Sequence, residues 1–261
     1  MPDAAVGQAG GILSEIENGG GPMSQNSKGC RRGRRVAGLV RHGHFDRPDE
    51  TASAHRLLAL SDEGRAQARA GADAILMLCQ EQNLELDSTI EVSQLLRAWE
   101  TGTILAEQFT EKLGISFDVK EHDEIIERGI GSCANLRFSE IEAVLALDPR
   151  LEPLPTGWRR RPEFKLPVQG AESLMQAGMR TGSYIATSVD AMPDDDPRDL
   201  LRLFVAHSGC LRHAAVYLGA VDIGEVSGLS MNFCQTILIE KSESGDWERR
   251  GGDWKKHLPG V

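Results

Sequence analysis

The chain has 261 residues, of which 40% are apolar and 26% charged, as in an ordinary globular protein with a sizeable core. Its formal net charge of −10 argues against a nucleic-acid partner, which would require a basic face. No apolar stretch approaches the ~18 residues of a membrane span, so no membrane partner is expected either. An acidic balance still permits a phosphorylated substrate, because a few arginines in one pocket can hold a phosphate.

Residues 1–33 are predicted to be a disordered N-terminal tail. The stretch 10–29 is rich in Gly, Ser and Asn and has no lasting periodicity. The arginines of 30–35 resemble an export signal only superficially, because no apolar segment of suitable length follows them. One folded domain is therefore expected over 34–261.

The compact apolar stretches of that domain predict strands, and the amphipathic stretches between them predict helices. The predicted strands are 35–40, 88–92, 200–209 and, last in the chain, 234–241. The predicted helices are 60–78, entered through Ser61 and Asp62, then 93–109, capped by Ser93, and 210–221. Residues 121–180 are expected to form mostly loops and short helices. This alternation predicts an α/β fold with a mostly parallel central sheet.

Arginine and histidine follow three of the predicted strands. Arg41 and His42 come directly after the first strand, Arg97 lies one turn into the helix after the second, and His207 follows the strand that begins at residue 200. Ligands of open α/β sheets bind at the carboxyl ends of the strands. Two Arg and two His at one such edge suit an anion, and a phosphoryl group in particular.

The same residues lie in motifs that resemble the histidine phosphatase (phosphoglycerate mutase-like) superfamily. The motifs occur in the order of that family and are LVRHG (39–43), LSDEGRAQA (60–68), SQLLRAWET (93–101), ERGIGSCANLRFSEIEA (127–143) and VAHSGCLR (205–212). Weaker similarities are GAES (170–173) and GDWKKHLPG (252–260). The resemblance implies a three-layer α/β/α sandwich of the phosphoglycerate mutase-like type.

The resemblance also implies roles. His42 would be the nucleophile that forms a phosphohistidine, and Glu127 would protonate the leaving oxygen and then activate water. Arg41, Arg97 and His207 would complete the catalytic set by surrounding the phosphoryl oxygens. The residues expected to bind substrate are Arg41, Gly43, His44, Arg97, His207 and Ser208. Gly43 is expected to let the backbone pass close to the phosphate.

The proton donor stays open at this point, because Glu121, Asp123 and Glu124 lie close to Glu127 in the sequence. A neutral histidine nucleophile and a protonated carboxylic acid together predict a bell-shaped rate profile with an acidic to neutral optimum, hence an acid phosphatase.

Several other residues invite functional interpretations. The remaining histidines have no ligand spacing, so no metal and no cofactor is expected. Cys210 near a helix start has either a lowered pKa or no role, and His213 is expected to be a structural helix residue. Residues 158–161, a Trp followed by three Arg, form either a substrate-recruiting rim or a solvated charge run beside a packed Trp.

The expected function is phosphomonoester hydrolysis. The mutases of the family continue the RHG motif with Glu-Ser and Trp-Asn, whereas this chain has HFDRPDE at 44–50, and their long insert is not recognisable before Gly170. The alternatives are a phosphoglycerate mutase-type phosphotransferase and a non-catalytic phosphate-binding scaffold. The substrate, a phosphorylated small molecule or a phosphoprotein, would contact mainly 44–58 and 132–170, and an oligomer is possible. The cysteines are odd in number and include no CxxC pair, which favours a reducing compartment and a cytoplasmic location. They are Cys30, Cys79, Cys133, Cys210 and Cys234.

Overall fold

The computed structural model describes residues 32–47, 51–52, 55–242 and 244–256. Almost all of the predicted N-terminal tail (1–33) lies outside the described residues. The strands are β1 (Arg35–Arg41), β2 (Glu85–Ser93), β3 (Asp118–His122), β4 (Leu200–Ala206), β5 (Leu229–Ser230), β6 (Thr236–Lys241), β7 (Trp247–Gly251) and β8 (Lys255–Lys256). The α-helices are α1 (Asp62–Gln82), α2 (Leu96–Leu113), α3 (Phe138–Ala146), α4 (Leu174–Asp190), α5 (Ser208–Tyr217) and α6 (Ile223–Val226).

Six of these strands form one mostly parallel sheet, in the order β3-β2-β4-β1-β6-β7. The first four pair in parallel, and β6 and β7 add antiparallel strands at one side. The four parallel strands therefore end at one edge, as the α/β prediction requires. The strand over 234–241 was predicted correctly but not as the last one, since β7 and β8 follow it.

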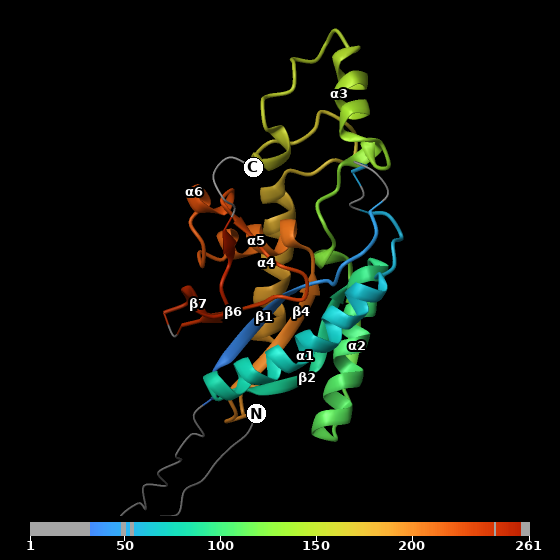
Figure 1. The fold of residues 1–261 in the computed structure, drawn as a ribbon. Coiled ribbons are helices and arrows are strands. Elements are labelled where there is room, and N and C mark those ends of the chain that lie inside the picture. The colour runs from blue at the N-terminus through green and yellow to red at the C-terminus, as the bar shows by residue number, and fades with distance from the viewer. Residues whose placement is uncertain (1–31, 48–50, 53–54, 243, 257–261) are drawn as a thin grey trace, which may run out of the picture. The chain divides into compact units, whose positions relative to one another are not determined.

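Helices cover both faces of this sheet, so the three-layer prediction is confirmed (Figure 1). The side chains of β1 alternate between the faces: Val36 and Val40 pack in one core with α1 and α2. Ala37 and Leu39 pack in the other core with α4 and α5. A third, smaller core, which contains Trp158, surrounds α3 and its loops.

The predicted entry to α1 is confirmed, because the Ser61 hydroxyl accepts a hydrogen bond from the Gly64 N–H at 3.1 Å. The predicted cap of the second helix is wrong. Ser93 is the last residue of β2, and α2 begins only at Leu96, after Leu95 as its N-cap without a side-chain bond. The Ser93 hydroxyl turns instead toward His207, as described below.

Candidate active site

The sheet register brings the predicted phosphate-binding residues together. Arg41 pairs with Ala206 across β1 and β4, and the His42 N–H donates to the Ala206 carbonyl at 3.0 Å. The next residue along each strand is therefore a histidine, and the rings of His42 and His207 lie with centroids 5.0 Å apart. Two chain segments more than 160 residues apart thus meet because adjacent parallel strands end at the same level.

The backbone sets which nitrogen of His42 is free. Its Nδ1 lies 2.7 Å from the Gly43 carbonyl, which can only accept, so Nδ1 carries the proton. The lone pair is then on Nε2, which lies 3.4 Å from the donating Nε of Arg97. His42 is only 4% exposed, and the hydrogen bond of its Nδ1 holds the ring. The unprotonated Nε2 therefore points in one fixed direction.

Arg97 and Ser93 hold His207 in the complementary orientation. An Arg97 N–H donates to His207 Nδ1 at 3.3 Å, so the ring proton is on Nε2, which donates to the Ser93 hydroxyl at 2.9 Å. Arg97 is the second residue of α2 and is 2% exposed. One guanidinium thus contacts both histidines.

Arg41 is positioned by the segment that precedes β6. Its guanidinium donates to the Met231 carbonyl and lies 3.9 Å from the centre of the Phe233 ring, a cation–π contact. Phe233 also contacts the His42 ring, at a centroid distance of 5.9 Å. Sequence reasoning missed Phe233, because a lone aromatic residue in a loop carries no motif.

Glu127 comes from the loop between β3 and α3, and its carboxylate lies against the N-terminus of α5, facing Arg41 and His42. Its carboxylate accepts hydrogen bonds from the N–H groups of Gly209 and Cys210, at 3.1 and 3.0 Å, and from the N–H of Arg128 at 2.9 Å. The three other acids that the sequence left open line a different pocket, with Gln94 and His122. They are Glu121, Asp123 and Glu124. Glu127 is thus the carboxylate that lies beside Arg41 and His42.

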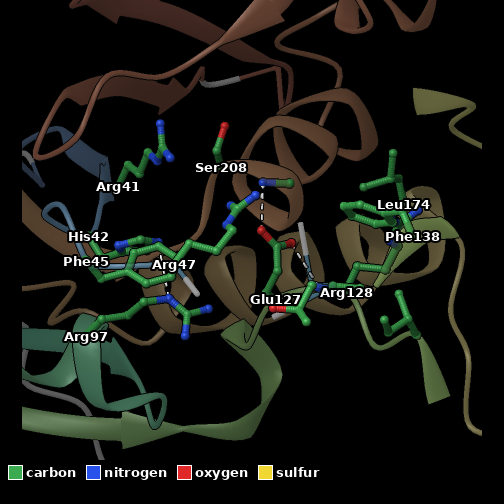
Figure 2. Close-up of a pocket in the computed structure, with 14 residues that line it drawn as sticks. Arg41, His42, Phe45, Arg47, Arg97, Glu127, Arg128, Phe138, Leu174 and Ser208 are labelled. Atoms are coloured by element: carbon green, nitrogen blue, oxygen red, sulfur yellow. Dashed lines mark hydrogen bonds between the residues drawn. The ribbon is translucent and has the colours of Figure 1, made fainter. Parts of the chain in front are cut away.

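These side chains line a cavity of about 240 Å³. In Figure 2, Arg41, His42 and Arg97 lie on one side of Glu127, and Arg128, Phe138 and Leu174 lie on the other. The side chain of Arg47 begins near the Phe45 ring and crosses the middle of the cavity (Figure 2). The lining residues are Arg41, His42, Phe45, Arg47, Thr51, Ala52, Arg97, Glu127, Arg128, Ile130, Phe138, Leu174, Ser208 and Gly209.

Burial and positive charge keep the two histidines neutral. Desolvation, followed by the charge of Arg97, holds the pKa of both His42 and His207 well below the usual value. Desolvation also lowers the pKa of Arg41 and of Arg97 to about 10, with the charge of Arg47 adding to the effect. The arginines stay charged at neutral pH, so the cavity combines neutral nitrogen bases with fixed cations.

Sequence reasoning did not assign Arg47 or Arg128 to the cavity, although Arg128 lies in the motif at 127–143 and Arg47 lies four residues after LVRHG. In the structure both line the cavity, Arg47 as an exposed residue and Arg128 as a half-buried one beside Glu127. Neither position shows from the sequence alone which way its side chain turns. A count of arginines within a few residues of RHG and of Glu127 would have marked both as candidates.

The structure places two of the expected substrate-binding residues elsewhere. His44 does not line the cavity; its Nδ1 pairs with the Ser61 hydroxyl at 2.7 Å. Gly43 is required by α1: a Cβ there would come within 2.6 Å of the Gly64 carbonyl oxygen. Gly43 is not among the residues that line the cavity, and its proximity to a bound phosphate stays a prediction. Ser208 does line the cavity.

Four other residues that the sequence analysis considered have defined surroundings in the structure. Burial raises the pKa of the Cys210 thiol, so the thiolate alternative is wrong. His213 is buried in α5, where its Nδ1 lies 2.8 Å from the Gly209 carbonyl, and burial lowers its pKa to about 4. Trp158 is packed, its indole N–H donating to Glu142 at 2.9 Å, and Arg159 lies 4.5 Å from the centre of the Phe138 ring.

Among the residues that the structure describes, no group of three or more His, Cys, Asp or Glu side chains is placed to hold a metal ion. No helix within the described ranges has the length and apolar character needed to cross a membrane.

Residues 38–251 match the family model described as "Histidine phosphatase superfamily (branch 1)". Three similar solved structures are a mycobacterial glucosyl-3-phosphoglycerate phosphatase (23% identity, TM-score 0.61), a putative alpha-ribazole-5'-P phosphatase from Escherichia coli (17%, 0.60) and a phosphoserine phosphatase from Entamoeba histolytica (13%, 0.59). The aligned regions cover 83%, 84% and 84% of this chain and 97%, 96% and 96% of those chains. The search of curated proteins returned no match.

Proposed function

This chain belongs to the histidine phosphatase superfamily (branch 1), and we propose that within it the chain is a phosphomonoester hydrolase that works through a phosphohistidine on His42. The single observation that carries the proposal is the geometry of His42. Its Nδ1 is pinned to the Gly43 carbonyl, and its unprotonated Nε2 is directed at Arg97 in a cavity that Glu127 lines.

In the first proposed step, His42 Nε2 attacks phosphorus, and the P–N bond forms as the ester P–O bond breaks. The leaving oxygen takes a proton from Glu127, which becomes a carboxylate. Arg41, Arg97 and His207 stabilise the charge on the phosphoryl oxygens, and we add Arg47 to this set because its charge acts on Arg41, Arg97 and His42.

In the second proposed step, a water molecule replaces the alcohol. Glu127 takes one proton from the water as its oxygen bonds to phosphorus, and the P–N bond breaks to leave inorganic phosphate and neutral His42. The N–H groups of Gly209 and Cys210 hold the carboxylate at the place where both proton transfers occur. The enzyme returns to its starting protonation state, so the cycle needs no cofactor.

The pKa shifts support activity in the acidic range. Because the pKa of His42 is held well below its usual value by burial and by Arg97 and Arg41, the nucleophile stays neutral below pH 6.5. Loss of nucleophile by protonation therefore affects the rate only in stronger acid, and the proposed first step uses Glu127 in its acid form. The rate profile is expected to be bell-shaped with an acidic to neutral optimum.

The proposal is tested with p-nitrophenyl phosphate and three proteins: wild type, His42→Ala and His122→Gln. His122 is the matched control, because it lies outside the cavity at the end of β3. His42→Ala is expected to lose activity by at least ~10³-fold, while His122→Gln keeps it. Acid quenching with labelled substrate should trap a base-stable, acid-labile adduct in the wild type and the control, and none in His42→Ala.

Equal and negligible rates in wild type and His42→Ala would contradict hydrolysis and favour a phosphate-binding scaffold. Phosphoglycerate mutase activity that depends on a bisphosphorylated activator, with little release of inorganic phosphate, would instead favour the phosphotransferase.

A further inference from the structure

Resting on the proposed hydrolase function, we propose that Arg128 binds a second acidic group on the substrate. The preferred substrates are then small phosphomonoesters whose leaving alcohol carries a carboxylate or a second phosphate. This assigns a residue and a substrate class to the side of the cavity that lies beyond Glu127.

Arg128 is a half-buried cation without a salt bridge to any carboxylate among the described residues. The two carboxylates whose charges act on it are already engaged. Glu172 pairs with Arg180 at 2.9 Å, and Glu127 accepts the N–H groups at the start of α5. A partly desolvated guanidinium without a direct partner is costly, and desolvation lowers the Arg128 pKa accordingly. A ligand anion would remove that cost.

Position separates Arg128 from the other cavity arginines. Arg41, Arg97 and the imidazole of His42 lie on the opposite side of Glu127 (Figure 2). Since Glu127 protonates the leaving oxygen in the proposed reaction, whatever lies beyond it contacts the leaving alcohol and not the phosphoryl group. The charge of Arg47 depresses the pKa of Arg41 and of Arg97 but does not act on Arg128, which places Arg47 with the phosphoryl set.

The charges of the cavity support the same assignment. A phosphoryl dianion is met by Arg41, Arg47 and Arg97. Glu127 is the only carboxylate among the lining residues that the structure describes, and it is protonated when it acts as the acid. Arg128 then remains as a cation that the phosphoryl group does not neutralise. One further negative charge on the leaving alcohol would balance it.

The remaining wall limits the size and character of that alcohol. Phe138 and Leu174 present apolar surface beside Arg128 (Figure 2), and Ile130 adds to the apolar lining of the cavity. The cavity has a volume of about 240 Å³, and a small phosphomonoester with a short acidic chain is of a size that suits it.

The test compares three substrates built on a three-carbon chain: the phosphate ester of 3-hydroxypropanoic acid, the neutral amide of that ester, and the bisphosphate of 1,3-propanediol. Wild type is expected to prefer at least one acidic substrate over the amide by ~10- to 100-fold in kcat/KM, as for a charge-assisted hydrogen bond. A higher kcat/KM for the carboxylic acid than for the amide would identify a carboxylate as the bound group, and a higher kcat/KM for the bisphosphate would identify a phosphate.

Arg128→Gln should reduce that preference to about 1- to 2-fold, and Arg128→Lys should retain part of it because the charge is kept. Arg160→Gln is the matched control: Arg160 is exposed, does not line the cavity and carries the same charge, so its removal should leave the preference unchanged. Equal rates for acid and amide in wild type, or a preference that survives Arg128→Gln, would overturn the proposal.

The same compounds separate this proposal from the proposed function. A protein that hydrolyses all three substrates equally is a phosphatase without the Arg128 site. If no substrate is hydrolysed, calorimetric binding of the acid and the amide to wild type and Arg128→Gln still decides the question. Tighter binding of the acid, lost in the variant, supports the site, and equal binding refutes it.

Discussion

The two sides of the cavity are built in different ways. On the His42 side, the side chains stand at the end of a strand or in the first turn of the helix that follows, and the sheet register sets their spacing. On the Arg128 side, the lining comes mainly from loops and from α3, which pack around the third, smaller core. The first side suits a group that every substrate shares, and the second can vary with the substrate.

Glu127 lies between the two sides of the cavity. Its replacement is expected to give the largest change in rate that distinguishes the phosphoryl side from the leaving-group side. Glu127→Gln should slow hydrolysis of an alkyl phosphate by ~10³- to 10⁴-fold, because the leaving alkoxide requires a proton. The p-nitrophenolate leaving group of p-nitrophenyl phosphate is stable without a proton. The rate constant of the nitrophenol burst should therefore fall by only ~10-fold or less. The measurement is the pre-steady-state rate with each ester.

Glu124→Gln serves as the control for that experiment, because Glu124 lies in the separate acidic pocket. Equal losses with both esters would show that Glu127 does not act on the leaving group, and the division of the cavity into two sides would then fail.

Ser93 offers a smaller change that is confined to the His42 side. Without the hydroxyl, the Nε2–H of His207 loses its acceptor and the ring loses its fixed orientation. Ser93→Ala should lower kcat by about 10-fold, equally for good and poor leaving groups, with Ser93→Thr largely restoring it. Ser139→Ala, in α3, is the control on the other side. A loss in Ser93→Ala that depends on the leaving group would contradict the assignment.

The smallest predicted effect is on stability in acid, and it comes from His213, which lies in α5 outside the cavity. The folded-state pKa of His213 is about 4 and the unfolded value about 6.5, so below pH 6.5 only the unfolded chain takes up a proton there. Stability should therefore fall as pH drops from 6.5 toward 4. His42 and His207, whose folded pKa values are also depressed, act in the same direction.

Urea midpoints at pH 7.5 and 5.0 measure this fall. His213→Leu should show a shallower dependence on pH than the wild type, whatever its stability at pH 7.5. An identical dependence in the two proteins would mean that His213 is protonated in the folded state.

The His42 side could be predicted because it rests on strand ends. Arg41, His42 and His207 follow strands whose apolar character is evident, and a parallel sheet brings its strand ends to one edge. The elements that sequence reasoning missed lack such a signal. β3 is largely exposed, and α4 is rich in Gly, Ser and Thr, which weaken the helical pattern.

The small residues of α4 have a reason that only the packing reveals. A Cβ at Gly178 would come within 2.5 Å of His213, so α4 can approach α5 closely only because that residue is glycine. The sequence could mark Arg47 and Arg128 as candidates, but tertiary contacts of the loops decide that their side chains turn into the cavity. Local patterns describe neighbours along the chain, and these residues depend on neighbours in space.

The contact between Gly43 and Gly64 has a consequence for the activation barrier. Each glycine packs so closely against the backbone around the other that a Cβ at either position would clash. The loop that carries His42 therefore packs directly on the first turn of α1. If His42 is the nucleophile, as proposed, part of the freedom that it would lose on the way to the transition state is already lost when the chain folds. We expect the contact between Gly43 and Gly64 to lower the entropic part of the activation barrier in this way.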